Sequence, residues 1–425
     1  MLFDHTTNKS LMEELHEIPP RKARARDAFI LGINYWPARS AMRWWQRFDE
    51  DEVERDFARL GRAGFNVVRI FLLWEDFQPT PASVSETMLR RLVRVADITA
   101  NNGLRLIPTL FTGHMSGVNW LPAWALDFRA PTSPPRFRIV AQNRVVQAVP
   151  KNWYADDAII AAQALLARAV AQTLAGHRAV WAWDLGNENS NCVVPPSREA
   201  GISWLVRMSD EIRAADPHRP VTIGLHMEDL EEDRKIGPAE AAQTCDFLCM
   251  HGYPLYAGWA ENETDEFVLP FLGLVTYWLG GRDVFFEEFG APTKPPGSEA
   301  GVSPFKLLPE DEAARFTRRA LASLHRFGLM GAAVWCANDY SEKIWHEPPL
   351  DQSVHERFFG LWRADGSAKP AVFEVESFDK RERLVLCRDF SWVDLTPENF
   401  YESPRRNLAH LYRRFRTHFA DTLRP

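Results

Sequence analysis

Two glutamates stand out because each follows a short apolar run. Residues 179–182 (AVWA) lead into residues 183–189 (WDLGNEN), which carry Glu188, and residues 284–286 (VFF) lead into Glu287-Glu288-Phe289-Gly290. We interpret both runs as buried strands that deliver a carboxylate at their C-terminal ends. Two carboxylates facing one bond are what glycosidic cleavage requires, since one protonates the leaving oxygen and the other attacks the anomeric carbon or activates water. Glu188 and Glu288 are therefore the candidate catalytic residues.

Position carries this inference more than residue type, because glutamates are common on any surface. Cleavage with retention needs the two carboxyl groups about 5 Å apart. Strands on opposite sides of a barrel bring side chains together at one rim. Side chains alternate along a strand, so Val284, Phe286 and Glu288 should share a face. Alternation does not tell which face points inward, so it leaves Glu287 and Glu288 both open.

The rest of the chain supplies a framework for such a rim. Eight short apolar runs are candidate strands, at residues 29–34, 66–71, 104–110, 179–182, 221–224, 247–250, 284–286 and 332–335. Helical patterns separate them, as in Val53, Phe57, Leu60 and Ala63, which recur every three or four residues. Strands that alternate with helices favour parallel pairing. The sequence predicts an α/β protein with a closed (β/α)8 (TIM) barrel and long rim loops.

We expect three parts along the 425 residues. Residues 1–28 form an N-terminal arm, residues 29–381 the catalytic barrel, and residues 382–425 a C-terminal helical extension packed on the barrel. Residues 112–153 contain five prolines and are predicted to be a long irregular loop, and the segment 338–359 is another. Loops of this length in a compact domain are usually functional walls or lids.

Composition excludes several classes of protein. The net charge of −7 is spread over mixed clusters, which does not favour a nucleic-acid partner. No run is long enough to span a membrane, and residues 1–26 lack the apolar core of a secretory signal. The five cysteines fit no zinc site. We expect a cytoplasmic enzyme with no cofactor, no metal and no membrane partner, and a homo-oligomer is left open.

Several motifs resemble glycoside hydrolase family 5 and occur in that family's order. They are residues 64–70 (GFNVVRI) at the second strand, Asn187-Glu188, His251-Gly252-Tyr253, Glu288-Phe289-Gly290 and Trp335. The resemblance covers roughly residues 29 to 370. It implies a clan-A barrel and a retaining double displacement.

The resemblance also implies roles for individual residues. Glu188 would be the acid/base, Glu288 the nucleophile, Asn187 a donor to the sugar 2-hydroxyl, Arg69 and Tyr253 hydrogen-bond partners of the nucleophile, and Trp335 the floor of the sugar site. Glu287 would then point to the helix layer or pair with a cation. Arg69 and Tyr253 should keep Glu288 ionised by lowering its pKa. Glu188 should have a raised pKa, since it must be protonated before attack.

Other candidates for substrate binding are less specific. His251 is expected to tune either glutamate, and His114 to bind substrate or to make a structural hydrogen bond. Trp36 and Trp74 are candidates for stacking on sugar rings, although the scaffold is the more common place for each such ring.

The substrate is predicted from three further segments, 33–37, 71–77 and 111–117, which resemble a bacterial exo-β-mannosidase branch. That branch is linked to mannosyl-N-acetylglucosamine. We predict an exo-β-mannosidase that removes terminal β-mannose from a small oligosaccharide, with the two long rim segments closing the groove. The alternatives are an endo-β-mannanase or β-glucosidase/cellulase, and a non-catalytic carbohydrate-binding barrel.

Overall fold

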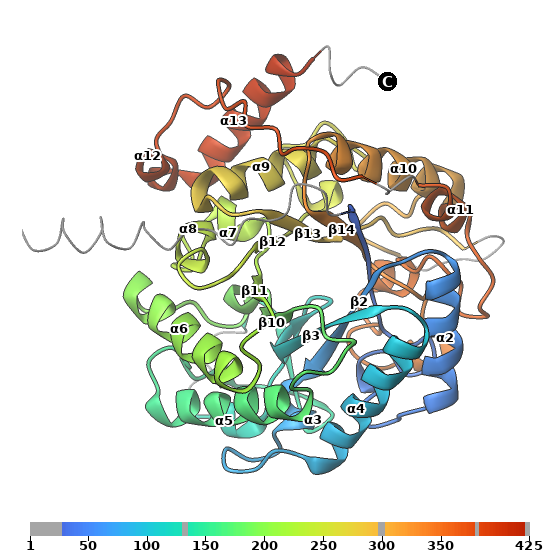
Figure 1. The fold of residues 1–425 in the computed structure, drawn as a ribbon, viewed down its shortest axis with the longest axis vertical. Helices are drawn as coiled ribbons and strands as arrows, with labels where there is room; N and C mark the ends of the chain where they lie inside the picture. Colours follow the sequence, from blue (N-terminus) through green and yellow to red (C-terminus); the bar gives the residue numbers. More distant parts are fainter. Residues whose placement is uncertain (1–27, 130–134, 296–301, 379–381, 421–425) are drawn as a thin grey trace, which may run out of the picture.

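The structure is a computed structural model that describes residues 28–129, 135–295, 302–378 and 382–420. Eight parallel strands surround a central axis (Figure 1). They are β1 (Ile30–Asn34), β2 (Val67–Leu73), β3 (Arg105–Thr112), β10 (Trp183–Asn187), β11 (Val221–Gly224), β12 (Leu248–His251), β13 (Val284–Phe289) and β14 (Gly331–Val334). The sheet runs in the order β11-β10-β3-β2-β1-β14-β13-β12. Its two edges meet where the His251 N–H donates to the Leu225 carbonyl at 2.8 Å. The predicted (β/α)8 barrel is confirmed.

Helices cover the outside of the barrel (Figure 1). The longer ones are α2 (Glu50–Arg62), α4 (Glu86–Asn101), α5 (Asp157–Thr173), α6 (Arg198–Ala215), α9 (Val268–Gly280), α10 (Glu310–Arg326) and α11 (Pro370–Glu376), and the short α3 (Trp74–Phe77), α7 (Glu228–Glu231) and α8 (Pro238–Ala241) fill the remaining connections. Local sequence determines where helices α2, α4 and α6 begin. Their N-cap residues Asp49, Ser85 and Ser197 each accept a hydrogen bond from a backbone N–H of the first turn.

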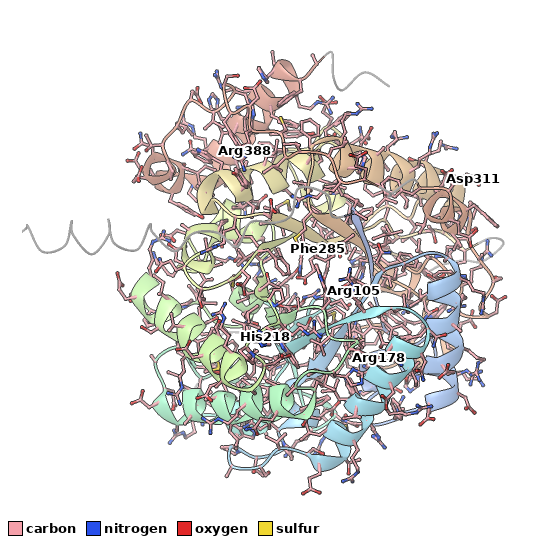
Figure 2. All side chains as sticks on the ribbon, viewed as in Figure 1. Arg105, Arg178, His218, Phe285, Asp311 and Arg388 are labelled. Atoms are coloured by element: carbon pink, nitrogen blue, oxygen red, sulfur yellow. The ribbon has the colours of Figure 1, made fainter. Side chains whose placement is uncertain are left out.

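A small apolar cluster fills the barrel interior, separate from the large cluster between strands and helices. It contains Ile30, Val67, Ile107, Ala182, Phe247, Cys249, Phe285 and Ala333. Figure 2 shows Phe285 near the centre of the ring, with Asp311 and Arg388 at its periphery. A Cβ at Gly32 would lie 2.8 Å from that of Ala333. Glycine is needed at position 32 because any side chain there would collide with Ala333 of the neighbouring strand β14.

Two local expectations are wrong. The fourth strand is β10 at 183–187, and in the run 179–182 only Val180 makes an isolated bridge, to Leu106. Residues 112–153 are not irregular: β4 (His114–Met115), β5 (Val118–Trp120), β7 (Arg138–Ala141) and β8 (Arg144–Val146) form a small sheet, and β6 (Leu126–Asp127) pairs with β9 (Val149–Pro150). Strands of two to four residues are too short for alternation to reveal them.

The C-terminal residues form α12 (Pro397–Glu402) and α13 (Pro404–His418), which lie outside α9 (Figure 1). The Tyr412 hydroxyl donates to Asp265 at 2.5 Å, and its ring lies 5.0 Å from that of Phe271 on α9. Helix α13 therefore covers the outer face of α9, most of whose residues are buried. The predicted N-terminal arm lies outside the described residues except for residue 28. No helix in the described part of the chain is long and apolar enough to cross a membrane.

Candidate active site

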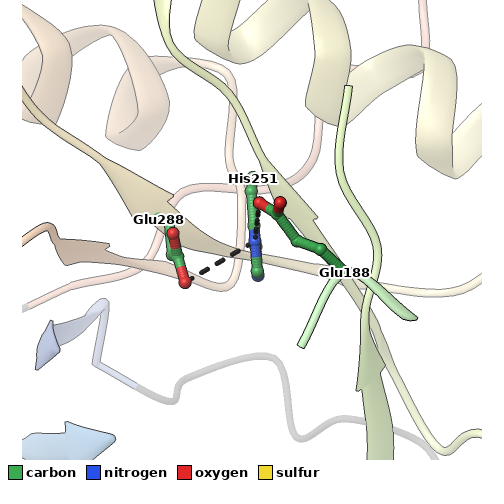
Figure 3. A group of neighbouring side chains, drawn as sticks. All are labelled: Glu188, His251 and Glu288. Atoms are coloured by element: carbon green, nitrogen blue, oxygen red, sulfur yellow. Dashed lines mark hydrogen bonds and ion pairs between the residues drawn. The ribbon is translucent and has the colours of Figure 1, made fainter. Parts of the chain in front are cut away.

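Glu188 and Glu288 meet at the C-terminal ends of β10 and β13. A carboxylate oxygen of each, together with a ring nitrogen of His251, lies within 4.8 Å of the others. Figure 3 shows His251 between the two carboxylates. Glu188 directly follows β10 with φ 48°, in the left-handed region that non-glycine residues seldom adopt. The carboxylates predicted from the sequence are thus brought together at one rim.

An extra residue in β13 brings Glu287 and Glu288 to the same side. The pairing of β13 shifts register against both β12 and β14 at this point, which is a β-bulge. Arg69 contacts both carboxylates, at 2.6 Å for Glu288 and 3.2 Å for Glu287. Strict alternation is therefore wrong here: Phe286 packs in the outer cluster, yet Glu288 faces the barrel axis. Of the two predictions for Glu287, pairing with a cation is confirmed.

Arg69 is a fully buried cation beneath the site. Besides both glutamates it binds Asp184 at 2.7 Å and donates to the Asn187 side-chain oxygen at 2.9 Å. Burial lowers the pKa of Arg69, but the neighbouring carboxylates raise it above its usual value, so the side chain stays charged. Arg69 is not among the residues that line the cavity. The predicted hydrogen bond from Arg69 to Glu288 is confirmed, and Arg69 holds this carboxylate from below without reaching the substrate.

Both oxygens of Glu288 have a partner, because Tyr253 donates to the second one at 2.8 Å. Burial nevertheless raises the pKa of Glu288 above its usual value, although His251 and Arg69 oppose the shift. Arg69 and Tyr253 lower this pKa as expected, but desolvation of the fully buried carboxylate outweighs them, so the net shift is upward. The two donors orient the carboxylate.

Glu188 is surrounded by histidines. His251 contacts Oε1 at 3.0 Å, and His226 and His114 lie 3.7 and 3.9 Å from Oε2. Burial raises the pKa of Glu188, but the histidines lower it overall to below its usual value. The expected upward shift is therefore wrong in the structure. His226, which follows β11, belongs to no motif that the sequence analysis used.

His251 links the acidic groups. Its Nδ1 contacts Glu188, and its Nε2 contacts Glu287 at 3.2 Å. Burial lowers the pKa of His251, yet Glu288 and the hydrogen-bonded Glu188 and Glu287 raise it to about 10. His251 is then an imidazolium that donates from both nitrogens. Glu188, His251 and Glu288 are close enough together to hold a metal ion. Each already has a hydrogen-bond or ion-pair partner among the side chains, since His251 contacts Glu188 and Arg69 contacts Glu288.

A cavity of about 570 Å³ opens over these groups. Seven predicted residues line it: His114, Asn187, Glu188, His251, Tyr253, Glu288 and Trp335. The amide of Asn187 donates to the His114 carbonyl at 2.9 Å, and the His114 ring contacts Asn119 at 2.7 Å. His114 therefore makes the structural hydrogen bond and also faces the cavity.

Trp36 and Trp74 do not reach the cavity, and their prediction as stacking residues is wrong. Trp36 is fully buried and stacks on Phe71 with 4.9 Å between ring centroids. Trp74 packs edge-on against Trp124 and donates to Gln78. Both rings fill the layer between strands and loops, which is the more common place for a tryptophan.

Several residues that line the cavity are not predicted from the sequence. They include Ser116, Arg136, Phe137, His226, Tyr256, His355 and Glu356. Most come from connections after the strands, where no periodic pattern exists. The only signal was that Ser116, Arg136, Phe137, His355 and Glu356 fall in the two long segments predicted as walls.

Comparison with solved structures identifies the class of barrel. A GH5_18 protein from Streptomyces cattleya in complex with GlcNAc has a TM-score of 0.77 at 21% identity, over 93% of this chain and 92% of that one. A variant of it in complex with Manβ1-4GlcNAc gives 0.74 at 22%, with the same coverage. The exo-β-1,4-mannosidase Op5Man5 from Opitutaceae bacterium strain TAV5 gives 0.66 at 26%, over 82% of this chain and 58% of that one.

The fold is that of the clan-A glycoside hydrolases. Within that class, the resemblance to glycoside hydrolase family 5 predicted from the motifs is confirmed by these neighbours. No protein-family model and no curated protein matches the sequence.

Proposed function

We propose that the protein is a retaining exo-β-mannosidase. The observation that carries the retaining mechanism is the separation of the carboxylates, with one oxygen of Glu188 within 4.8 Å of one of Glu288. Retaining glycosidases hold the two groups about 5 Å apart, whereas inverting enzymes leave about 6.5–9.5 Å for a water molecule.

In this mechanism Glu288 attacks the anomeric carbon while Glu188 protonates the leaving oxygen. Arg69 and Tyr253 orient the attacking carboxylate through one hydrogen bond to each oxygen. The proton that Glu188 needs lies on His251 Nδ1, 3.0 Å from Glu188 Oε1. Its transfer leaves His251 neutral, with the remaining proton on Nε2 facing Glu287. Glu188 then accepts a proton from water, whose oxygen displaces Glu288 from the sugar, and returns that proton to His251 Nδ1.

Contacts between the two rim segments support exo action. The Ser116 hydroxyl donates to Glu356 at 2.9 Å, and Arg138 binds Asp351 through two hydrogen bonds of 2.7 and 2.8 Å. Segments 112–153 and 338–359 are thereby joined beside the cavity. A polymer crossing the site would need a groove open at both ends, whereas a joined wall suits a terminal sugar.

The choice of β-mannose rests on likeness to Op5Man5 and to the GH5_18 protein that binds Manβ1-4GlcNAc. The test compares nitrophenyl β-mannoside with the β-glucoside and follows digestion of end-labelled manno-oligosaccharides. We expect mannose alone, with the labelled chain shortening one unit at a time. Early internal fragments would favour an endo-β-mannanase, and preference for the glucoside a β-glucosidase.

Covalent labelling tests the nucleophile independently of chain length. A 2-fluoro-β-mannoside should inactivate the enzyme and leave its sugar on Glu288, as seen by peptide mass spectrometry. A label on Glu287 would contradict the assignment, and inversion of the released anomer would contradict the retaining mechanism. The absence of any turnover on glycosides would favour a carbohydrate-binding barrel.

A further inference from the structure

Glu356 is a carboxyl group that lines the cavity and has no part in the double displacement. Glu356 belongs to the 3-10 helix Val354–Phe358, in the connection after β14. Its side chain is 9% exposed, and it lines the same cavity as Glu188 and Glu288. A carboxyl buried beside two others is costly for folding unless it has partners that offset the lost hydration.

The partners of Glu356 are neutral donors. Ser116 donates to Oε2 at 2.9 Å, and Trp335 and Tyr256 also hydrogen-bond the side chain. His355 lies 3.5 Å from Oε1, but burial lowers the pKa of His355 to about 4, so the imidazole is neutral at pH 7. Within the described ranges, no ion pair joins Glu356 to an arginine or lysine.

A nearby carboxyl in the same connection differs from Glu356 because it forms an ion pair with a lysine. Asp339 is also buried, but Lys369 lies 2.7 Å away and donates to it. Glu356 lacks such a cation and faces the cavity instead. Burial raises the pKa of Glu356 to about 7, and the charges of Glu288 and Glu188 add to the rise. Near neutral pH the group can both accept and donate a hydrogen bond, as sugar hydroxyls do.

The location of Glu356 indicates which part of a sugar it meets. Its bond to Ser116 is one of the contacts that join the two rim segments. It also hydrogen-bonds Trp335, the predicted floor of the sugar site. A terminal sugar whose C1 faces Glu288 extends its C4 side toward such a closed wall. The 4-hydroxyl is the group that a β-1,4-linked internal unit lacks.

We propose that Glu356 is a specificity-determining residue that hydrogen-bonds the free 4-hydroxyl of the non-reducing terminal sugar and so restricts cleavage to chain ends. This inference rests on the proposed function. It assigns recognition of the chain end to one side chain, in addition to the steric effect of the walls.

The test measures kcat/KM for an aryl β-mannoside and its 4-deoxy and 6-deoxy analogues. A hydrogen bond to a charged group contributes about 1.5–3 kcal/mol, which corresponds to roughly 10- to 100-fold in rate. The wild type should prefer the parent over the 4-deoxy analogue by that factor. Glu356→Ala should lose the same factor on the parent and almost nothing on the 4-deoxy analogue. Glu356→Gln, which keeps the shape and a neutral donor, should lie between.

A matched control is Glu347→Gln. Glu347 lies on the same segment, pairs with Arg47 at 2.8 Å and does not line the cavity, so its replacement should leave the ratio of parent to 4-deoxy rates unchanged. Equal losses on parent and 4-deoxy substrates in both Glu356 variants would overturn the proposal, as would a change confined to the 6-deoxy ratio. If Glu356→Ala does not fold, the ratio of kcat/KM for the parent to that for the 4-deoxy analogue, measured in Glu356→Gln, decides between the two outcomes.

The two proposals fail in different ways. A wild-type enzyme that does not cleave β-mannosides contradicts the proposed function before any variant is made. A wild type that does, with a ratio unaffected by Glu356, contradicts only the inference about the 4-hydroxyl.

Discussion

Replacing Arg69 by methionine tests whether one buried cation holds the carboxyl cluster together. Arg69 contacts Glu288, Asp184 and Glu287 at 2.6, 2.7 and 3.2 Å, and its side chain is 0% exposed. Methionine keeps part of the apolar stem and removes the charge, which leaves His251 as the cation in contact with the cluster. Breaking a buried ion pair from one side costs about 3–5 kcal/mol, and we expect the free energy of unfolding at pH 7 to fall by that amount.

Acidification should reduce this deficit. Without Arg69, the folded-state pKa values of the three carboxyls rise above their unfolded values, so the folded protein binds protons more tightly. Stability of the variant then increases as pH falls. In the wild type, burial and Glu287 already raise the pKa of Asp184 to about 6. The gap between wild type and variant should therefore narrow between pH 7 and pH 5.

Urea unfolding followed by tryptophan fluorescence at pH 5, 6 and 7 provides the measurement. Adding Asp184→Asn to Arg69→Met should recover stability, because one uncompensated charge disappears. Arg90→Met is the control: this exposed arginine pairs with the exposed Glu86, and its loss should change stability by less than about 1 kcal/mol. A deficit below about 1 kcal/mol for Arg69→Met, or one that grows on acidification, would refute the reasoning.

Two further predictions separate catalytic from structural roles. Glu188→Ala should lower kcat/KM for manno-oligosaccharides by about 10²- to 10⁴-fold but affect activated aryl mannosides far less, because only poor leaving groups need protonation; equal losses on both would indicate a structural role. Trp74→Phe should lower the free energy of unfolding by about 0.5–3 kcal/mol. It should leave KM for the aryl mannoside unchanged, since Trp74 does not line the cavity; a large rise in KM would restore it as a sugar contact.

The barrel could be predicted because most strands carry enough apolar residues in the right order. Residues 221–224 coincide with β11 as predicted. The fourth strand was misplaced by four residues because β10 carries Asp184 and Asn187, which look like loop residues. Both are buried because Arg69, more than a hundred residues earlier, binds them. A polar strand satisfied by a distant partner cannot be recognised from local hydrophobicity.

The site was predicted in its main residues and not in its electrostatics. The motifs point to Glu188 and Glu288, but the bulge that brings Glu288 to the same side as Glu287 leaves no pattern in the residues FFEEF. The pKa of Glu188 depends on His226, which reaches the site from another strand. Aromatic content likewise says nothing about which rings face the cavity, so Trp36 and Trp74 were misassigned. Each error concerns a contact between segments far apart in sequence.

Helix α9 is synthesised well before α13, the helix that covers its outer face. Helix α9 has the sequence VLPFLGLVTYWLG, with ten of its residues buried. Part of its cover, the Tyr412 and Phe415 rings against Phe271, emerges from the ribosome only after the whole barrel. Until then a growing chain presents an apolar helix face to water, as chaperone clients do. Synthesis of α13, and not closure of the barrel, is the step that conceals this surface.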